Sequence, residues 1–118
     1  MTTAAQTTGK QAENRALAYL QAQGLSLCAR NFQIRRGEID LIMREGDEIA
    51  FIEVRARRPG AFGDGIDSVT RAKQRRLVAA ASAWLQRQRE QPATRFDVVG
   101  VAPGDELIWI KDAFRPDD

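Results

Sequence analysis

Residues 37–57 read GEIDLIMREGDEIAFIEVRAR and are the most strand-like part of the chain. Its apolar and β-branched side chains predict two strands, at residues 37–45 and 48–57. Gly46 and Asp47 separate the strands and form a dipeptide typical of a tight hairpin turn. We therefore expect an antiparallel hairpin at the centre of the fold.

The turn determines which residues face each other across this hairpin. With a loop at residues 46–47, the numbers of facing residues sum to 93, so Asp40 lies opposite Glu53. Directly opposed side chains have Cβ atoms about 4.5–5.5 Å apart, and like charges there are destabilising. A divalent cation, protonation of one acid, or a nearby arginine would relieve the repulsion. The other face is apolar and is expected to pack on the core, with Ile39, Leu41, Met43, Ala50, Ile52 and Val54.

A basic side chain, that of Arg55, is also expected on the face that carries the two acids. Arg55 lies two residues beyond Glu53, which places it on the same face about 6.6 Å along the strand. The alternative is a surface ladder of ion pairs that links Glu38, Arg55, Glu53 and Arg57. A three-residue loop would shift the register by one and separate the two acids onto opposite faces.

Two helices are predicted on either side of the hairpin. Thr8 and Gln11 fit a capping box, which predicts a helix at residues 9–23. A second amphipathic helix is expected at residues 71–89, with Thr70 as its N-cap. Both helices carry an apolar stripe, so both are expected to pack on a sheet.

Three further strands complete the prediction, at residues 26–34, 95–101 and 107–111. The element order is then αβββαββ, which favours an α/β fold with a mixed sheet of about five strands and helices packed on it. Residues 58–67 are rich in Gly and Pro and are expected to form a loop. The chain is expected to be a single domain, residues 1–118, with loose tails at residues 1–7 and 115–118.

The composition excludes several kinds of catalytic site. The chain of 118 residues has no histidine and one cysteine, Cys28, which rules out His-based zinc sites, Ser-His-Asp triads and CxxC redox pairs within one chain. Chemistry must then use carboxylates, amides, hydroxyls, Lys or Arg, or a metal ion held by oxygen ligands. With no apolar run long enough to cross a bilayer and no signal-peptide pattern, we expect a cytoplasmic protein without membrane contacts.

Basic residues concentrate in the middle of the chain. Residues 30–89 carry 13 basic and 8 acidic side chains, whereas residues 90–118 carry 3 basic and 7 acidic ones. Clusters of this kind suit a phosphate backbone, although a solvated face of an arginine-rich protein is the alternative. The candidate nucleic-acid-binding residues are Arg35, Arg36, Arg57, Arg58, Arg71, Lys73, Arg75 and Arg76.

Two polar residues interrupt the apolar stripes of the predicted helices. Glu13 lies on the inward side of the first helix, and Gln74 lies one turn before Leu77 on the second. Each is explained either by a local hydrogen bond at the edge of the core or by a site shared with the acids of the hairpin.

The segments GEIDLI and FIEVRAR, followed by a loop and a helix that opens TRAKQRRL, resemble the D…ExK core of the PD-(D/E)xK nuclease superfamily. The chain is more closely similar to the YraN-type family of uncharacterised bacterial proteins, which resemble archaeal Holliday junction resolvases. The resemblance runs from GKQAENRALAYL to RFDVVGV, nearly the whole chain. The short D…ExK pattern is weakly specific, and the two helices and the RFDVV strand make it specific for the family.

The resemblance implies a restriction-endonuclease-like fold and metal-dependent hydrolysis of phosphodiester bonds in DNA, branched DNA included. Asp40 and Glu53 match the metal-binding acids, and Glu13 matches an acid on the first helix of resolvase-like members. Gln74 matches a polar residue on the helix that follows the motif, and Arg55 stands where the motif has lysine. The implied cofactor is Mg²⁺ or Mn²⁺, and the implied assembly is a homodimer.

Two positions depart from the motif. Ile39 replaces the proline, which carries no chemistry, and Arg55 replaces the lysine. Because arginine stays charged, Arg55 can stabilise charge on a phosphate but cannot act as a base. Two alternatives therefore stand beside a nuclease: a nucleic-acid-binding protein that does not cleave, and a partner-binding protein whose interface uses Trp84, Trp109 and Phe114.

Overall fold

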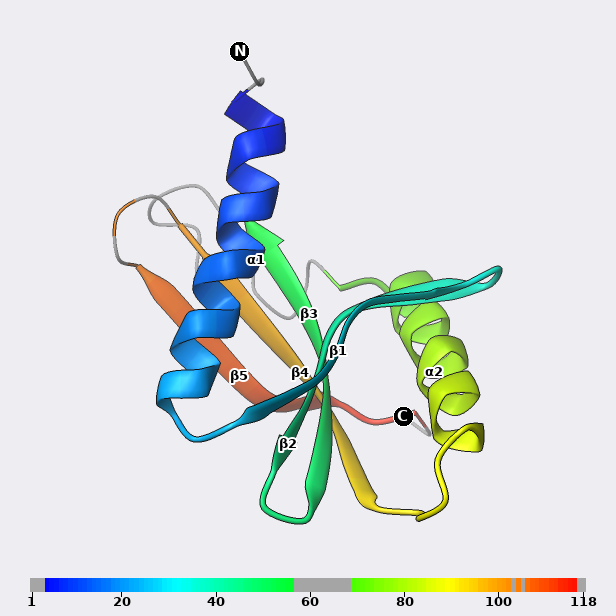
Figure 1. Cartoon of the computed structure of the whole chain (residues 1–118). Helices are drawn as coiled ribbons and strands as arrows, with labels where there is room; N and C mark the ends of the chain where they lie inside the picture. Colours follow the sequence, from blue (N-terminus) through cyan, green and yellow to red (C-terminus); the bar gives the residue numbers. More distant parts are fainter. Residues whose placement is uncertain (1–3, 57–68, 103, 105, 117–118) are drawn as a thin grey trace.

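The chain forms one five-stranded sheet with a helix on each face (Figure 1). The computed structural model describes residues 4–56, 69–102, 104 and 106–116, with side chains from residue 9 onward. Its elements are α1 (Ala4–Ala22), β1 (Ser26–Ile34), β2 (Gly37–Glu45), β3 (Glu48–Ala56), α2 (Arg71–Gln86), β4 (Ala93–Val101) and β5 (Leu107–Phe114).

The strands lie in chain order, β1-β2-β3-β4-β5. Strands β3 and β4 are parallel, and the other three neighbouring pairs are antiparallel. A parallel pair needs a crossover connection, and α2 lies within the segment that provides it. This arrangement confirms the predicted order αβββαββ and the mixed sheet, and it is consistent with a restriction-endonuclease-like fold. Among the described residues, no helix has the length and apolar character that a bilayer span requires.

The helices differ from their predicted bounds at one end each. Helix α1 begins at Ala4, so Thr8 lies inside it and the predicted capping box is wrong. Alanine is the strongest helix former, and the alanines at positions 4 and 5 extend the helix backwards. Helix α2 begins as predicted, with Thr70 Oγ1 accepting a hydrogen bond from the Lys73 N–H at 3.2 Å. It ends at Gln86, before the predicted residue 89, since residues 87–91 offer no apolar side chain to bury.

The strands near the C-terminus are longer than predicted. Strand β4 begins at residue 93 and β5 continues to Phe114, beyond the predicted end at residue 111. The ring of Phe114 stacks on that of Phe96 at 4.9 Å between centroids, which keeps the end of β5 on the sheet. The predicted loop at residues 58–67 and the end of the predicted strand at residue 57 lie outside the described residues.

The predicted hairpin register is confirmed near the turn. The pairs between β2 and β3 run from Glu45–Glu48 to Leu41–Ile52, and each pair sums to 93. Gly46 supports the turn with a φ of +60°, a conformation that glycine adopts without steric cost. The pairing between β2 and β3 ends at Leu41, and beyond it the Val54 N–H donates a hydrogen bond to the Asp40 carboxylate.

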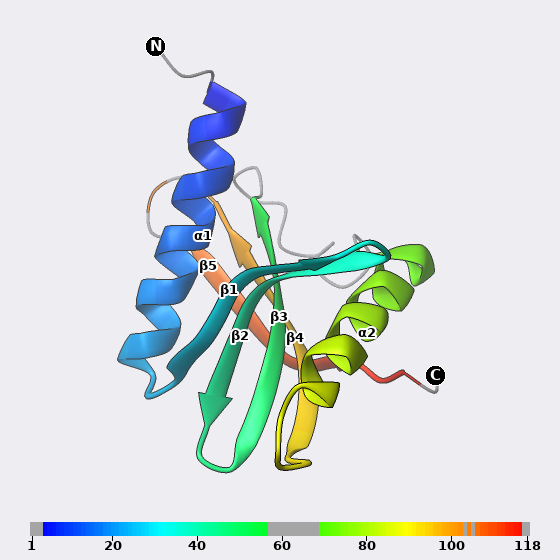
Figure 2. The ribbon, with the colours of Figure 1, turned by 45° about the vertical axis from the view of Figure 1, so that its right-hand side comes forward.

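Strand β2 leaves β3 at this point and continues with β1 as a two-stranded arm that reaches α2 (Figure 2). Asn31 of β1 and Asp40 of β2 occupy the bend, and Asn31 has a φ of +54°. Because the strand bends there, Ile39 packs in the core beneath α2, whereas Val54 packs toward α1. The prediction that Ile39 and Val54 share one face is therefore wrong.

Both faces of the hairpin are buried. The predicted core face packs against α1 through Leu41, Met43, Ala50 and Ile52. The face that carries the acids is also covered, because Ile42, Ile49 and Phe51 pack beneath α2. Asp40 and Glu53 therefore lie at the edge of an apolar layer and not on an open surface.

Candidate metal and nucleic-acid site

Asp40 lies at the end of the β2–β3 ladder, where its side chain replaces the missing backbone partner. Its Oδ2 accepts a hydrogen bond from the Val54 N–H at 2.8 Å. Burial, the charge of Glu53 and a hydrogen bond with Glu53 together raise the pKa of the Asp40 carboxyl to about 7, although the Val54 N–H lowers it. The predicted proximity of the two acids is thus present, and the charge of Glu53 acts on Asp40.

Glu53 has two cations beside it. Its Oε2 lies 3.5 Å from Arg55 Nη1 and 3.5 Å from Lys73 Nζ, and its side chain is 13% exposed. Arg55 reaches it along β3, as the alternation predicts. Lys73 comes from the first turn of α2, where the Thr70 cap fixes the start of the helix. An arginine from the strand and a lysine from the helix therefore share one carboxylate.

The position of Lys73 is the feature that the sequence did not reveal. The sequence assigned Lys73 to phosphate binding, and its proximity to Glu53 depends on how α2 crosses the sheet. The predicted N-cap at Thr70 was the available signal, because it places residue 73 on the first turn of the helix. It did not say which strand that turn would cross.

Glu13 is held on α1 by two side chains of β1. Its Oε1 accepts hydrogen bonds from Arg30 Nε at 2.6 Å and from Asn31 Nδ2 at 3.1 Å. Its charge still adds to the rise in the pKa of Asp40. In the described part of the chain, no three acid, histidine or cysteine side chains are grouped so that they could hold one metal ion. The structure therefore pairs Asp40 with Glu53 and keeps Glu13 in an ion pair with Arg30.

Gln74 makes the local hydrogen bond that was the alternative to a shared site. Its Nε2 donates to the Val69 carbonyl at 3.1 Å. It lines a separate cleft together with Arg71, Arg75 and Phe114. A role for Gln74 beside the acids stays a prediction, because in this structure Gln74 bonds to Val69 and lines another cleft.

A basic cleft of about 290 Å³ opens next to Glu53 and is lined by residues of the β1–β2 arm and of α2. The two walls touch where Gly37 meets α2, since a Cβ on Gly37 would lie only 2.1 Å from the Arg76 carbonyl oxygen. Glu38 and Glu53 are the acids that line this cleft. The cations that line it are Arg35, Arg36, Lys73 and Arg76.

The cleft divides the predicted nucleic-acid-binding residues into three groups. Four of the eight line the cleft beside Glu53. Arg71 and Arg75 line the cleft of Gln74 on α2, and Arg57 and Arg58 lie outside the described residues. Only the first group is placed by the structure where a phosphate would lie close to the acids.

The donor set of this site suits a hard divalent cation. Asp40 and Glu53 offer carboxylate oxygens, the ligands that Mg²⁺ and Mn²⁺ prefer. Arg55 and Lys73 lie against Glu53, whereas burial and the charge of Glu53 raise the pKa of Asp40. A bound dication would supply the charge that is missing.

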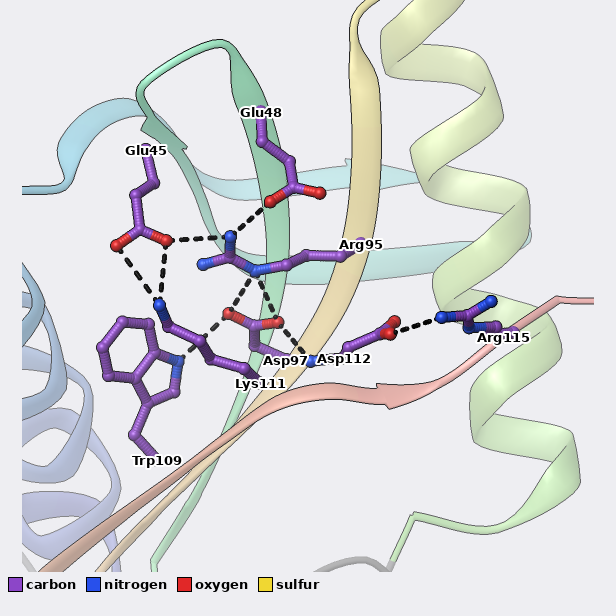
Figure 3. Close-up of polar contacts among 8 residues, drawn as sticks. All are labelled: Glu45, Glu48, Arg95, Asp97, Trp109, Lys111, Asp112 and Arg115. Carbon is purple, nitrogen blue, oxygen red and sulfur yellow. Dashed lines mark hydrogen bonds and ion pairs between the residues drawn. The ribbon is translucent and has the colours of Figure 1, made fainter.

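A second acidic cluster lies on the same sheet around Asp97 (Figure 3). The Asp97 side chain is fully buried, and its oxygens accept hydrogen bonds from Arg95 Nε at 3.0 and 3.1 Å. The Trp109 Nε1–H and the Asp112 backbone N–H also donate to Asp97, each at 3.0 Å. Protein donors therefore surround this carboxylate.

Arg95 extends the cluster to the β2–β3 turn. Its Nη1 lies 2.7 Å from Glu48 and 2.9 Å from Glu45, and Glu45 in turn pairs with Lys111 at 3.1 Å (Figure 3). Its Nη2 is buried, with no hydrogen-bond partner among the residues that the structure describes. The sequence predictions included neither Arg95 nor Asp97 as members of an ion-pair cluster.

The aromatic residues proposed for a partner interface are half-buried, and each contacts another side chain of the protein. The ring of Trp84 meets that of Phe51 at 5.9 Å, edge to face. Phe114 stacks on Phe96, and Trp109 bonds to Asp97. A partner interface that uses these three residues stays a prediction.

Comparison with known proteins identifies the family. The model of "Uncharacterised protein family UPF0102" matches residues 12–101. A UPF0102 protein of Nitrosococcus oceani is 54% identical over 112 residues, 91% of this chain and 90% of the relative. UPF0102 proteins of Herminiimonas arsenicoxydans and Halorhodospira halophila are 48% and 52% identical, over 96% and 91% of this chain and 90% and 86% of the relatives. This chain therefore belongs to family UPF0102, the YraN-type family that its motifs resemble.

Proposed function

We propose that this protein is a divalent-metal-dependent nuclease that hydrolyses phosphodiester bonds in DNA. The observation that carries the proposal is the pair Asp40 and Glu53. Burial and the charge of Glu53 raise the pKa of Asp40, and Glu53 lines a basic cleft. Such a pair costs stability, and perturbed carboxyl groups of this kind cluster at functional sites.

Asp40 and Glu53 would hold Mg²⁺ or Mn²⁺. Glu13 would join them only after leaving Arg30, so its contribution is expected to be smaller. When bound, the metal would polarise the scissile phosphate and lower the pKa of a coordinated water. The chain itself would orient Asp40 through the Val54 N–H, which fixes one carboxylate oxygen before any ligand arrives.

The cations would hold the phosphate backbone. Arg35, Arg36 and Arg76 line the cleft from its two walls, the arm and the helix. Arg55 would stabilise negative charge that develops on the phosphate, because its guanidinium stays protonated. A homodimer and a preference for branched DNA remain predictions from the resemblance.

Cleavage of end-labelled DNA tests the proposal. Single-stranded, duplex, flap and four-way-junction DNA are incubated with Mn²⁺ or with chelator, using the wild type, Asp40→Asn and Glu53→Gln. We expect metal-dependent cleavage that falls by more than about 100-fold in both variants, since loss of even an outer partner of a metal ligand costs roughly 10- to 100-fold. Glu38→Gln is the matched control, because Glu38 lines the same cleft and the change removes the same charge.

A nucleic-acid-binding protein without nuclease activity is the second candidate. Two observations favour it: arginine stands at the lysine position of the motif, and Arg30 holds Glu13 away from the pair. This candidate expects DNA binding in chelator that weakens steeply with salt, with no cleavage by the folded wild type. That result would replace the nuclease proposal.

A further inference from the structure

Lys73 contacts the acidic pair and the basic cleft at once. Its Nζ lies 3.5 Å from Glu53 Oε2, and its side chain lines the cleft together with Arg35 and Arg36. The side chain is 41% exposed on a flexible four-carbon stem, whereas the N-cap at Thr70 fixes its backbone. The ammonium group is therefore free to exchange partners while the helix stays in place.

Lys73 and a metal ion would compete for the carboxylate of Glu53. The ammonium lies beside Oε2, one of the two oxygens that a divalent cation would use, and it repels a second positive charge nearby. A phosphate in the cleft would offer Lys73 another anionic partner, next to the arginines that already line it. Nucleic acid would thus draw the ammonium away from Glu53 and leave its oxygen for the metal.

We infer that Lys73 couples the two ligands: it neutralises Glu53 while the cleft is empty and releases it when a nucleic-acid phosphate binds. This inference rests on the proposed metal site at Asp40 and Glu53. Coupling of this kind is reciprocal, so bound metal must also strengthen the binding of nucleic acid. Lys73 is a positioning residue in this role, since it controls the charge on Glu53.

Binding of Mn²⁺ tests the inference without any need for cleavage. Electron paramagnetic resonance of the free ion gives the Mn²⁺ affinity of the full chain, with and without a short DNA duplex whose phosphorothioate backbone resists cleavage. Without DNA, Lys73→Met is expected to bind Mn²⁺ about tenfold more tightly than the wild type, within the roughly 5- to 150-fold range of coupled sites. The DNA is expected to strengthen Mn²⁺ binding in the wild type by a similar factor and in Lys73→Met by much less.

Two further variants separate the ion pair from a general loss of charge. Arg76→Met removes one positive charge from the same cleft, so it is expected to weaken DNA binding but, at saturating DNA, to keep the coupling of the wild type. Lys73→Arg keeps the charge and is expected to restore the weaker binding of Mn²⁺ without DNA. If Lys73→Met behaves as Arg76→Met does, the inference is wrong and the metal site stands. If Asp40→Asn leaves Mn²⁺ binding unchanged, or if no variant binds Mn²⁺, the metal site is wrong and the inference is wrong with it.

Discussion

Asp40 and Asp97 are acids set in apolar strands of one sheet, and their surroundings differ in the charge that meets them. Asp97 receives two bonds from Arg95 and one each from Trp109 and Asp112, so every partner is a donor. Asp40 receives one backbone N–H, and the charge of another acid, Glu53, raises its pKa. The protein neutralises the fully buried acid with its own groups, and it leaves the half-buried acid beside the cleft with too little positive charge.

This difference distinguishes an acid that stabilises the fold from an acid that could bind a cation. Burial alone does not separate them, since both acids interrupt apolar strands. The sign of the neighbouring groups does, because a carboxylate among donors is satisfied, whereas a carboxylate beside another carboxylate gains most from a cation. One substitution, Asp to Asn, should therefore have opposite effects on the free energy of unfolding at the two positions.

The largest expected effect is at Asp97. The substitution Asp97→Asn keeps the shape but removes the charge of the fully buried acidic partner of Arg95, so we expect a loss of about 3–5 kcal/mol in the free energy of unfolding. Urea denaturation followed by circular dichroism measures it. Asp112→Asn removes an exposed partner of Arg115 and is expected to change stability by less than about 1 kcal/mol. Equal effects of the two variants would contradict a structural role for the Asp97 cluster.

At Asp40 the same change should stabilise the fold. The pKa of Asp40 rises from 3.8 to about 7 on folding, so the folded state holds its proton more tightly. The protein therefore loses stability as the pH rises from about 4 to about 7, and the loss is complete above pH 7. Asp40→Asn does not ionise, and its amide can donate to Glu53, so we expect a gain of about 2 kcal/mol at pH 8. A destabilised Asp40→Asn at pH 8, measured by urea denaturation, would show that Asp40 is a structural acid.

The Mn²⁺ affinity should follow the titration of Asp40. Because a metal ligand must be deprotonated, the affinity is expected to rise about tenfold per pH unit below about pH 7 and to level off above it. Titration with Mn²⁺ between about pH 5.5 and pH 8.5 measures this dependence. An affinity that already levels off near the ordinary pKa of an aspartate would mean that the ion binds elsewhere.

The smallest effect is expected at Gln74. Its bond to the Val69 carbonyl is local, so Gln74→Ala should cost about 0.5–1.5 kcal/mol in stability. The Mn²⁺ affinity of this variant should equal that of the wild type. A clear loss of Mn²⁺ affinity would return Gln74 to the site that the family resemblance suggests.

The sequence was sufficient for features that depend on neighbouring residues along the chain. The two-residue turn at residues 46–47 determines the hairpin register, and with it the proximity of Asp40 and Glu53. The N-cap at Thr70 follows from local hydrogen bonding in the same way. These features were predicted because a short segment contains all the groups that produce them.

Features that depend on distant contacts were missed. Arg95 meets Glu48 only because β4 pairs with β3, and Lys73 meets Glu53 only because α2 packs on the sheet. The break in alternation at Ile39 has a similar origin, since the arm bends toward a helix that comes much later in the chain. Alternation within one strand contains no information about such partners.

The single parallel pair among the described strands has a consequence for the order of folding. Strands β1, β2 and β3 are joined by short turns and can pair early, whereas β3 and β4 must wait for a long connection that includes α2. Asp40 and Glu53 are therefore expected to meet in the nascent chain before the helix brings Lys73 to them. Burial, the largest cause of the raised pKa of Asp40, is not yet complete at that stage, so folding should be faster at about pH 4, where protonation of one acid removes the repulsion in the early hairpin.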